Sequence, residues 1–258
     1  DSAWFKDNDR IQSVLLAWQA GIEGGLAVAD ILCGDVNPSG KLVDTFAGSF
    51  DDYPSSAGFN DSDDYVDYTE DIYVGYRYFE TIPGAAEKVN YPFGYGLSYT
   101  SFAIEGVSAQ LQEMNGVAQI AAQASVTNTG SMAGKEVVQL YYSAPQGKLG
   151  KPAKVLGAFA KTRCLQPGET QKVTLNLTVD SMASYDDTGK VAKSAYVMEA
   201  GEYAFHLGNS VRNTVELSYR YVEKEDRVTL QLQERVAPVL LKERMLSDGS
   251  YEALPVQP

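Results

Sequence analysis

Cysteine and histidine are scarce in this sequence of 258 residues. The two cysteines, Cys33 and Cys164, lie far apart in the chain, so a disulfide framework is not indicated. A single histidine, His206, and two cysteines are too few ligands for a typical zinc site. We therefore expect no metal and no cofactor, and we interpret His206, which stands among apolar strand residues, as structural.

Positive charge is also in short supply. The 21 Lys and Arg residues face 34 Asp and Glu residues, which gives a formal net charge of -13. A surface this acidic repels phosphate backbones and anionic membranes, so we expect no nucleic-acid partner and no membrane partner. Neutral substrates such as sugars are indifferent to this charge. No signal peptide opens the chain, which starts at Asp1 without Met, so the compartment stays open, with a soluble cytoplasmic protein slightly favoured.

The signatures of several enzyme classes are missing. The chain has no nucleophile elbow, no Ser/His/Asp set and no glycine-rich phosphate loop, which speaks against an α/β hydrolase or a nucleotide enzyme. Gly24 and Gly25 are then best explained by a tight turn or close helix packing. Acid–base chemistry would have to come from carboxylates, as in glycoside hydrolysis, but the acidic residues are too many to select a pair.

Residues 1–101 have the pattern of an α/β domain. The segment SVLLAW (13–18) predicts a short strand, and EGGLAVADILCG (23–34) predicts a helix that ends at Gly34. A strand, a glycine turn and a helix in this order are typical of α/β folds. The helix lacks strands that it should cover, so we expect residues 1–101 to be an α/β fragment that is unstable when expressed alone.

Residues 102–222 change to short alternating apolar runs separated by turn residues, which predicts about seven strands of an antiparallel β-sandwich. In the run 173–179 every second residue is apolar, so one face should be buried and the other wet. Without a Cys…Trp…Cys pattern, the sandwich should be of the fibronectin type III-like kind. Residues 223–258 are predicted to leave it as a strand, a short amphipathic stretch and a Pro-bearing tail. The apolar side chains of this tail should pack on something: Val236, Val239, Leu240, Leu241, Met245 and Leu246.

Five motifs in fixed order resemble the carboxyl-terminal half of glycoside hydrolase family 3 β-glucosidases. They are AWQAGIEGGLAVADILCGDVNPSGKL (17–42), YTEDIYVGYRYFE (68–80), YPFGYGLSYTSF (91–102), VTNTGSMAGKEVVQLYYSAP (126–145) and LGAFAKTRCLQPGETQKVTLNL (156–177). Together they span nearly all of residues 11–210. The resemblance implies that residues 1–101 are the last part of the α/β sandwich, that 102–222 are a fibronectin type III-like domain, and that 223–258 lead towards a barrel domain outside this chain.

The resemblance implies a retaining exo-β-glycosidase that hydrolyses terminal β-D-glucosyl residues. In this family a barrel supplies the aspartate nucleophile, and a loop of the α/β sandwich supplies the glutamate acid/base. Neither stretch is expected within this chain, so no residue is assigned a catalytic role. The expected partners are the barrel-containing remainder of the enzyme and a β-glucoside substrate, and a homo-oligomer stays open. A β-xylosidase-type family 3 enzyme and a non-catalytic carbohydrate-binding or docking module are the alternatives.

The tail resembles the bridge of family members of inverted order, in which the barrel follows the fibronectin domain.

Two interpretations are open for the segment 68–80. Tyr68 and Glu70 are weak candidates for contact with substrate sugars. The favoured alternative is structural, with ion pairs among Glu70, Asp71 and Arg77 and with its tyrosines packed. Asn37 and Lys41 of the NPSGKL turn are likewise expected to serve the turn rather than a sugar.

Overall fold

The computed structural model describes residues 2–233 and 240–255. Its helical segments are α1 (Ala3–Lys6), α2 (Gly24–Cys33), α3 (Tyr76–Phe79) and the 3-10 turns η1 (Phe50–Asp52), η2 (Ala86–Lys88) and η3 (Val179–Met182). Its strands are β1 (Phe46–Ala47), β2 (Val89–Tyr91), β3 (Phe102–Met114), β4 (Val117–Asn128), β5 (Val137–Ser143), β6 (Val155–Lys161), β7 (Thr170–Thr178), β8 (Ser184–Asp186), β9 (Ala195–Met198), β10 (Gly201–Gly208), β11 (Thr214–Glu223), β12 (Arg227–Gln231), β13 (Glu243–Met245) and β14 (Tyr251–Ala253).

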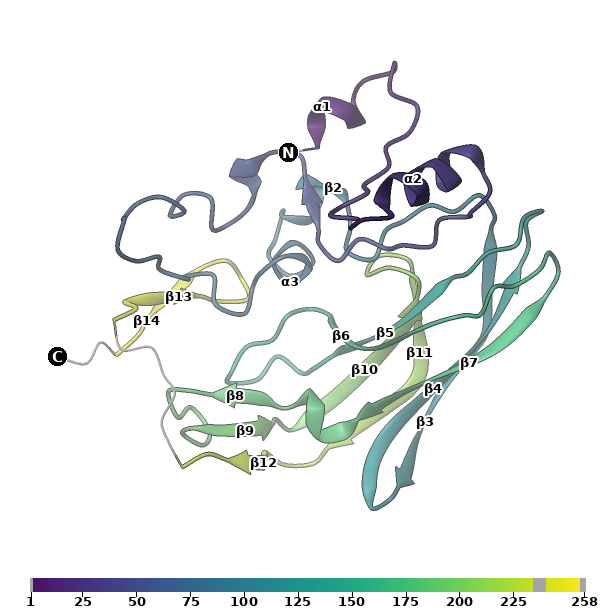
Figure 1. Cartoon of the computed structure of the whole chain (residues 1–258). Helices are drawn as coiled ribbons and strands as arrows, with labels where there is room; N and C mark the ends of the chain where they lie inside the picture. The colour runs from purple at the N-terminus through teal and green to yellow at the C-terminus, as the bar shows by residue number, and fades with distance from the viewer. Residues whose placement is uncertain (1, 234–239, 256–258) are drawn as a thin grey trace.

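The larger part of the chain is an antiparallel β-sandwich (Figure 1). One sheet has the strand order β11-β10-β5-β6, a second has the order β3-β4-β7, and a third, smaller sheet has the order β12-β9-β8. The core cluster draws on β4 and β7 from one side and on β5 and β10 from the other. The predicted sequence of α/β part followed by all-β sandwich is confirmed.

Side-chain alternation explains how these strands close over a core. In β7, Val173, Leu175 and Leu177 are buried, whereas Thr174 and Asn176 between them are exposed. Successive side chains of a strand point to opposite faces, so every second apolar residue enters the core. The predicted alternation in this run is therefore confirmed.

The α/β part is built from short elements around a core of its own, formed by Ala47, Phe79, Ala85 and Val89. The predicted helix is confirmed as α2, and Gly34 ends it in the left-handed conformation, with φ of 83°. The predicted strand at 13–18 is wrong, because this segment is an exposed irregular stretch. A strand needs a neighbour to pair its backbone groups, and no described strand pairs with this segment.

The strand predicted in the tail is confirmed as β12. Strand β12 pairs with β9, so the sandwich pairing continues beyond residue 222. Strands β13 and β14 form a hairpin next to α3 (Figure 1), and the backbone N–H of Met245 donates to the carbonyl of Thr69 at 2.7 Å. Met245 is buried as expected, whereas Leu240 is exposed and Val236 and Val239 lie outside the described residues.

Side chains of the NPSGKL turn join the two parts of the molecule. Asn37 donates from Nδ2 to the carbonyl of Ala133 at 3.0 Å, and Lys41 Nζ lies 2.9 Å from Glu136 Oε1. Asn37 Oδ1 also accepts from Ser98 Oγ at 2.8 Å. Asn37 and Lys41 were expected to stabilise their own turn. Their side chains instead contact Ala133 and Glu136 of the sandwich.

Candidate functional site

Two hollows lie along the segment that the sequence singled out. The smaller one has a volume of about 180 Å³ and includes both Tyr68 and Glu70 in its lining, together with Phe59 and Val66. Tyr68 is 69% exposed and stands at the surface, whereas Glu70 is only 4% exposed. The two candidate substrate residues therefore share one hollow, with only Tyr68 freely open to a ligand from solvent.

Local geometry holds this segment in place. The backbone N–H of Tyr73 donates to the carbonyl of Glu70 at 2.9 Å, and Asp71 adopts a positive φ of 50°. A non-glycine residue with positive φ is uncommon and is retained only where neighbours fix the backbone. The hydrogen bond from Met245 to Thr69 supplies one such constraint, so the tail hairpin helps to set the position of the Tyr68 and Glu70 backbone.

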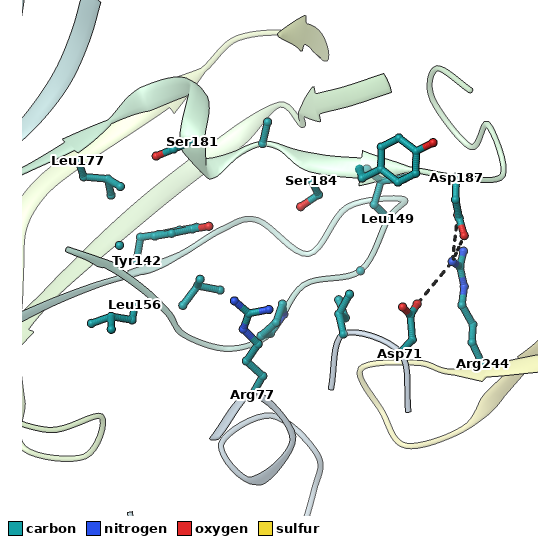
Figure 2. Close-up of a pocket in the computed structure, with 17 residues that line it drawn as sticks. Asp71, Arg77, Tyr142, Leu149, Leu156, Leu177, Ser181, Ser184, Asp187 and Arg244 are labelled. Carbon is teal, nitrogen blue, oxygen red and sulfur yellow. Dashed lines mark hydrogen bonds and ion pairs between the residues drawn. The ribbon is translucent and has the colours of Figure 1, made fainter. Parts of the chain in front are cut away.

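The larger hollow is a groove of about 560 Å³ between α3, the sandwich and the tail hairpin. Figure 2 shows Arg77 rising from α3 towards Tyr142, while Arg244 and Asp71 stand at the other end. Leu149, Leu156 and other apolar side chains complete its walls. The groove thus brings together residues that are far apart in the sequence.

Arg244 of β13 is the centre of a charged cluster at that end. Its Nη1 lies 3.0 Å from Asp187 Oδ2 and 3.5 Å from Asp71 Oδ2, and its Nε donates to Glu252 Oε1 at 2.8 Å. The side chains of Arg244 and Asp187 are 12% and 16% exposed, so their contact is largely shielded from water, whereas Asp71 is 37% exposed. Arg244 therefore joins the tail hairpin to the loop that precedes α3, through Asp71, and to the sandwich, through Asp187.

This cluster corrects the predicted ion pairs. Asp71 pairs with Arg244, and within the described residues Arg77 forms no ion pair with Glu70 or Asp71. The packing expectation holds for Tyr73, which is 2% exposed, and for Tyr76, whose ring lies 4.6 Å from that of Phe93. Sequence inspection missed Arg244 because a lone arginine in a charged tail gives no pattern that points to a partner some 170 residues away.

Burial and the charged neighbours shift several pKa values. Burial raises the pKa of Asp71 above its usual value, and the nearby Arg244 only partly opposes this effect. Burial alone would lower the pKa of Arg244, but Glu252, Asp187 and Asp71 more than offset it and raise that pKa. Burial raises the pKa of Tyr142 to about 12, so its hydroxyl keeps its proton at neutral pH.

Residues 2–233 and 240–255 also bear on metal binding and on membrane insertion. No group of three or more His, Cys, Asp and Glu side chains is placed there to hold a metal ion. No helix in that part of the chain has the length and apolar character needed to cross a membrane.

His206 is buried in β10 and lies 3.0 Å from Ser143 Oγ, which itself donates to the carbonyl of Ala153 at 2.6 Å. Ser143 Oγ thus contacts both the imidazole and a backbone carbonyl inside the sandwich.

Comparison with known protein families gives two matches. Residues 2–99 match the model described as glycosyl hydrolase family 3 C-terminal domain, and residues 136–211 match that of a fibronectin type III-like domain.

Similar proteins cover almost the entire chain. Beta-glucosidase A of Butyrivibrio fibrisolvens is 60% identical over 99% of this chain and 32% of its own length. A beta-glucosidase of Ruminococcus albus is 44% identical over 98% of this chain and 26% of its own. The chain therefore spans about a third or less of the length of these curated relatives.

Solved structures agree with the sequence relatives. A beta-glucosidase from Paenibacillus barengoltzii matches with a TM-score of 0.88 and 50% identity, over 100% of this chain and 30% of that one. Beta-glucosidase 3B from Thermotoga neapolitana, solved in complex with glucose, matches with a TM-score of 0.74 and 42% identity, over 85% of this chain and 29% of that one.

Proposed function

We propose that this chain is a portion of a retaining exo-β-glycosidase. The chain belongs to glycoside hydrolase family 3 through its C-terminal and fibronectin type III-like domains. The substrate class is terminal β-D-glucosyl residues. The observation that carries the proposal is the 60% identity to a beta-glucosidase over 99% of this chain. A relationship that close and that continuous supports a shared activity for the longer protein rather than a shared fold alone.

In this proposal the chain supports an active site whose reacting groups it does not supply. A retaining hydrolase needs an aspartate or glutamate nucleophile and a second carboxyl group about 5 Å away as acid/base. The carboxylates that line the two hollows are Asp67, Glu70, Asp71 and Asp187. Asp71 and Asp187 pair with Arg244 and Glu70 is buried, so neither hollow offers two free carboxylates. The nucleophile and the acid/base are accordingly assigned to parts of the enzyme outside these residues.

The domain division is also part of the proposal. Residues 1–101 form the end of the α/β sandwich domain, and the fibronectin type III-like domain begins at 102, where β3 starts. The pairing of β12 with β9 supports an end of this domain after Gln231 in place of 222. The hairpin β13–β14 then belongs to a bridge towards the barrel, as in family members of inverted domain order.

Tyr68 is proposed as a substrate contact, and Glu70 as the residue that shapes the floor of the same hollow. The exposed phenol of Tyr68 offers an apolar face and a hydroxyl, a combination that suits sugar rings. In the longer enzyme, Tyr68→Ala should raise KM for cellobiose while leaving kcat for an activated aryl glucoside unchanged. Equal KM values in the two proteins would remove Tyr68 from the site.

The proposal is tested by purifying the protein from its source and combining intact-mass measurement with hydrolysis of p-nitrophenyl β-D-glucoside. A polypeptide that contains this sequence together with a barrel-sized region, or a barrel-sized partner chain, should accompany the activity. Activity from the 258-residue chain by itself would contradict this division of roles, and a protein without turnover would contradict the enzyme assignment.

A further inference from the structure

We propose that the 560 Å³ groove between α3, the sandwich and the tail hairpin binds a short neutral oligosaccharide through Arg77 and Tyr142. None of the relatives' names describes such a site. The inference concerns this chain alone, so its test does not depend on the activity of the longer enzyme.

Tyr142 is the first observation behind this assignment. The residue lies in the interior strand β5 and is only 9% exposed, yet it lines the groove. Its hydroxyl makes no hydrogen bond with any described residue, and Figure 2 shows it directed into the groove. The hydroxyl therefore keeps its donor and its acceptor sites for a ligand that enters the groove.

Arg77 is the second observation. Its side chain rises from α3 towards Tyr142, and both residues line the groove. Across residues 2–233 and 240–255 it forms neither a side-chain hydrogen bond nor an ion pair. Two side chains with unused hydrogen-bonding capacity therefore line the same groove.

The balance of charge selects a neutral ligand. The four charged side chains in the lining are Arg77, Arg244, Asp71 and Asp187, so their formal charges cancel. Arg244 and the two carboxylates already satisfy one another at the far end. An anion would gain only Arg77 while approaching a chain of net charge -13. A neutral ligand rich in oxygen meets no such repulsion and still occupies the free donors.

The mixed apolar and polar lining of the groove favours a sugar over other neutral ligands. Leu149, Pro152 and Leu156 supply apolar surface beside the polar groups. A sugar ring presents C–H groups on its faces and hydroxyls on its edge, so it fits a groove that is apolar on one side and polar on the other. The volume lies within the range of about 300–1,000 Å³ that is usual for small-molecule sites. Two linked sugar units are a suitable length.

The test is an NMR titration of the 258-residue chain with cellobiose, with amide dispersion checked for every variant. Shifts should be confined to residues around the groove. Arg77→Gln and Tyr142→Phe should each weaken binding about tenfold, since each removes one hydrogen-bonding group. Arg163→Gln is the matched control, because Arg163 pairs with Glu169 at the exposed β6–β7 connection and lies outside the groove lining.

Several results would overturn the proposal. Absence of cellobiose shifts in the folded chain is one, and unchanged affinity in the Arg77→Gln and Tyr142→Phe variants is another. Tighter binding of D-glucuronate than of cellobiose would show that the free guanidinium is an anion site. Because activity is not read out, failure of this test leaves the enzyme assignment untouched.

Discussion

Lys41 Nζ lies 2.9 Å from Glu136 Oε1, and this ion pair joins the α/β part of the chain to the start of β5 in the sandwich. The two side chains are only 12% and 7% exposed. Glu136 Oε2 also accepts from Asn209 Nδ2 at 3.0 Å, and Lys41 donates to the carbonyl of Gly96 at 3.0 Å. The junction between the two parts is therefore a buried polar network.

Replacing one partner of this pair should destabilise the chain strongly. Lys41→Met leaves the Glu136 carboxylate buried without its counter-ion, which costs about 3–5 kcal/mol in the free energy of unfolding. Urea denaturation measures the loss. The control is Arg163→Met, whose pair with Glu169 is 52% and 34% exposed and should contribute about 1 kcal/mol or less. A Lys41→Met variant as stable as the control would show that the junction does not depend on this pair.

The neighbouring glycines Gly24 and Gly25 at the start of α2 should respond in opposite directions to alanine. A Cβ on Gly24 would lie 2.6 Å from Cβ of Ala20, whereas a Cβ on Gly25 meets no atom within 4 Å. Gly24→Ala should therefore lower the thermal midpoint. Gly25→Ala should raise stability by about 0.5–1 kcal/mol, because alanine loses less backbone entropy in a helix. Equal effects of the two substitutions would contradict the packing at Gly24.

The carboxylate of Asp186 should make the free energy of unfolding fall at acid pH. Burial alone would raise its pKa, but the backbone N–H groups of residues 189–192 all donate to its carboxylate and hold the pKa below its ordinary value. A folded-state pKa below the unfolded value of about 3.9 contributes stability that is complete above that value. This contribution is lost as the pH falls through the lower folded-state pKa.

The matching variant is Asp186→Asn. At pH 7 it should lose about 2 kcal/mol or more, because the amide cannot accept all four hydrogen bonds. The difference from the parent chain should shrink as the pH falls below about 4. Equilibrium unfolding in urea at several pH values gives this profile. A difference that stays constant down to about pH 2 would rule out the carboxylate as its source.

Arg244 should control the mobility of the segment that carries Tyr68 and Glu70. In Arg244→Met the tail hairpin loses its ion pairs with Asp71 and Asp187, so amides of residues 68–73 should exchange with deuterium about tenfold faster. Arg227→Met is the control, because its partners Asp180 and Glu223 lie elsewhere in the sandwich. Unchanged exchange over 68–73 in Arg244→Met would show that the hairpin does not restrain this segment.

The elements that sequence predicted well are those whose pattern is local. The alternation in β7 and the helix α2 with its terminal Gly34 follow from the spacing of apolar residues and from glycine's access to positive φ. The segment 13–18 has strand-like composition but pairs with no strand in the described part of the chain, and propensity alone does not make a strand.

The contacts that sequence could not predict join distant positions. Lys41 with Glu136, and Arg244 with Asp71 and Asp187, depend on how the two parts and the tail pack together. Nothing in the local sequence around Arg244 distinguishes it from a solvated tail residue. The same holds for the groove, which exists only where α3, β5 and the tail hairpin meet.

The most direct test of the enzyme assignment is the stereochemistry of hydrolysis by the complete polypeptide that contains this sequence. The first glucose released from p-nitrophenyl β-D-glucoside is followed by proton NMR before mutarotation mixes the anomers. We expect β-D-glucose to form first, as a retaining mechanism requires. Initial release of α-D-glucose, or the absence of glucose release, would contradict the assignment.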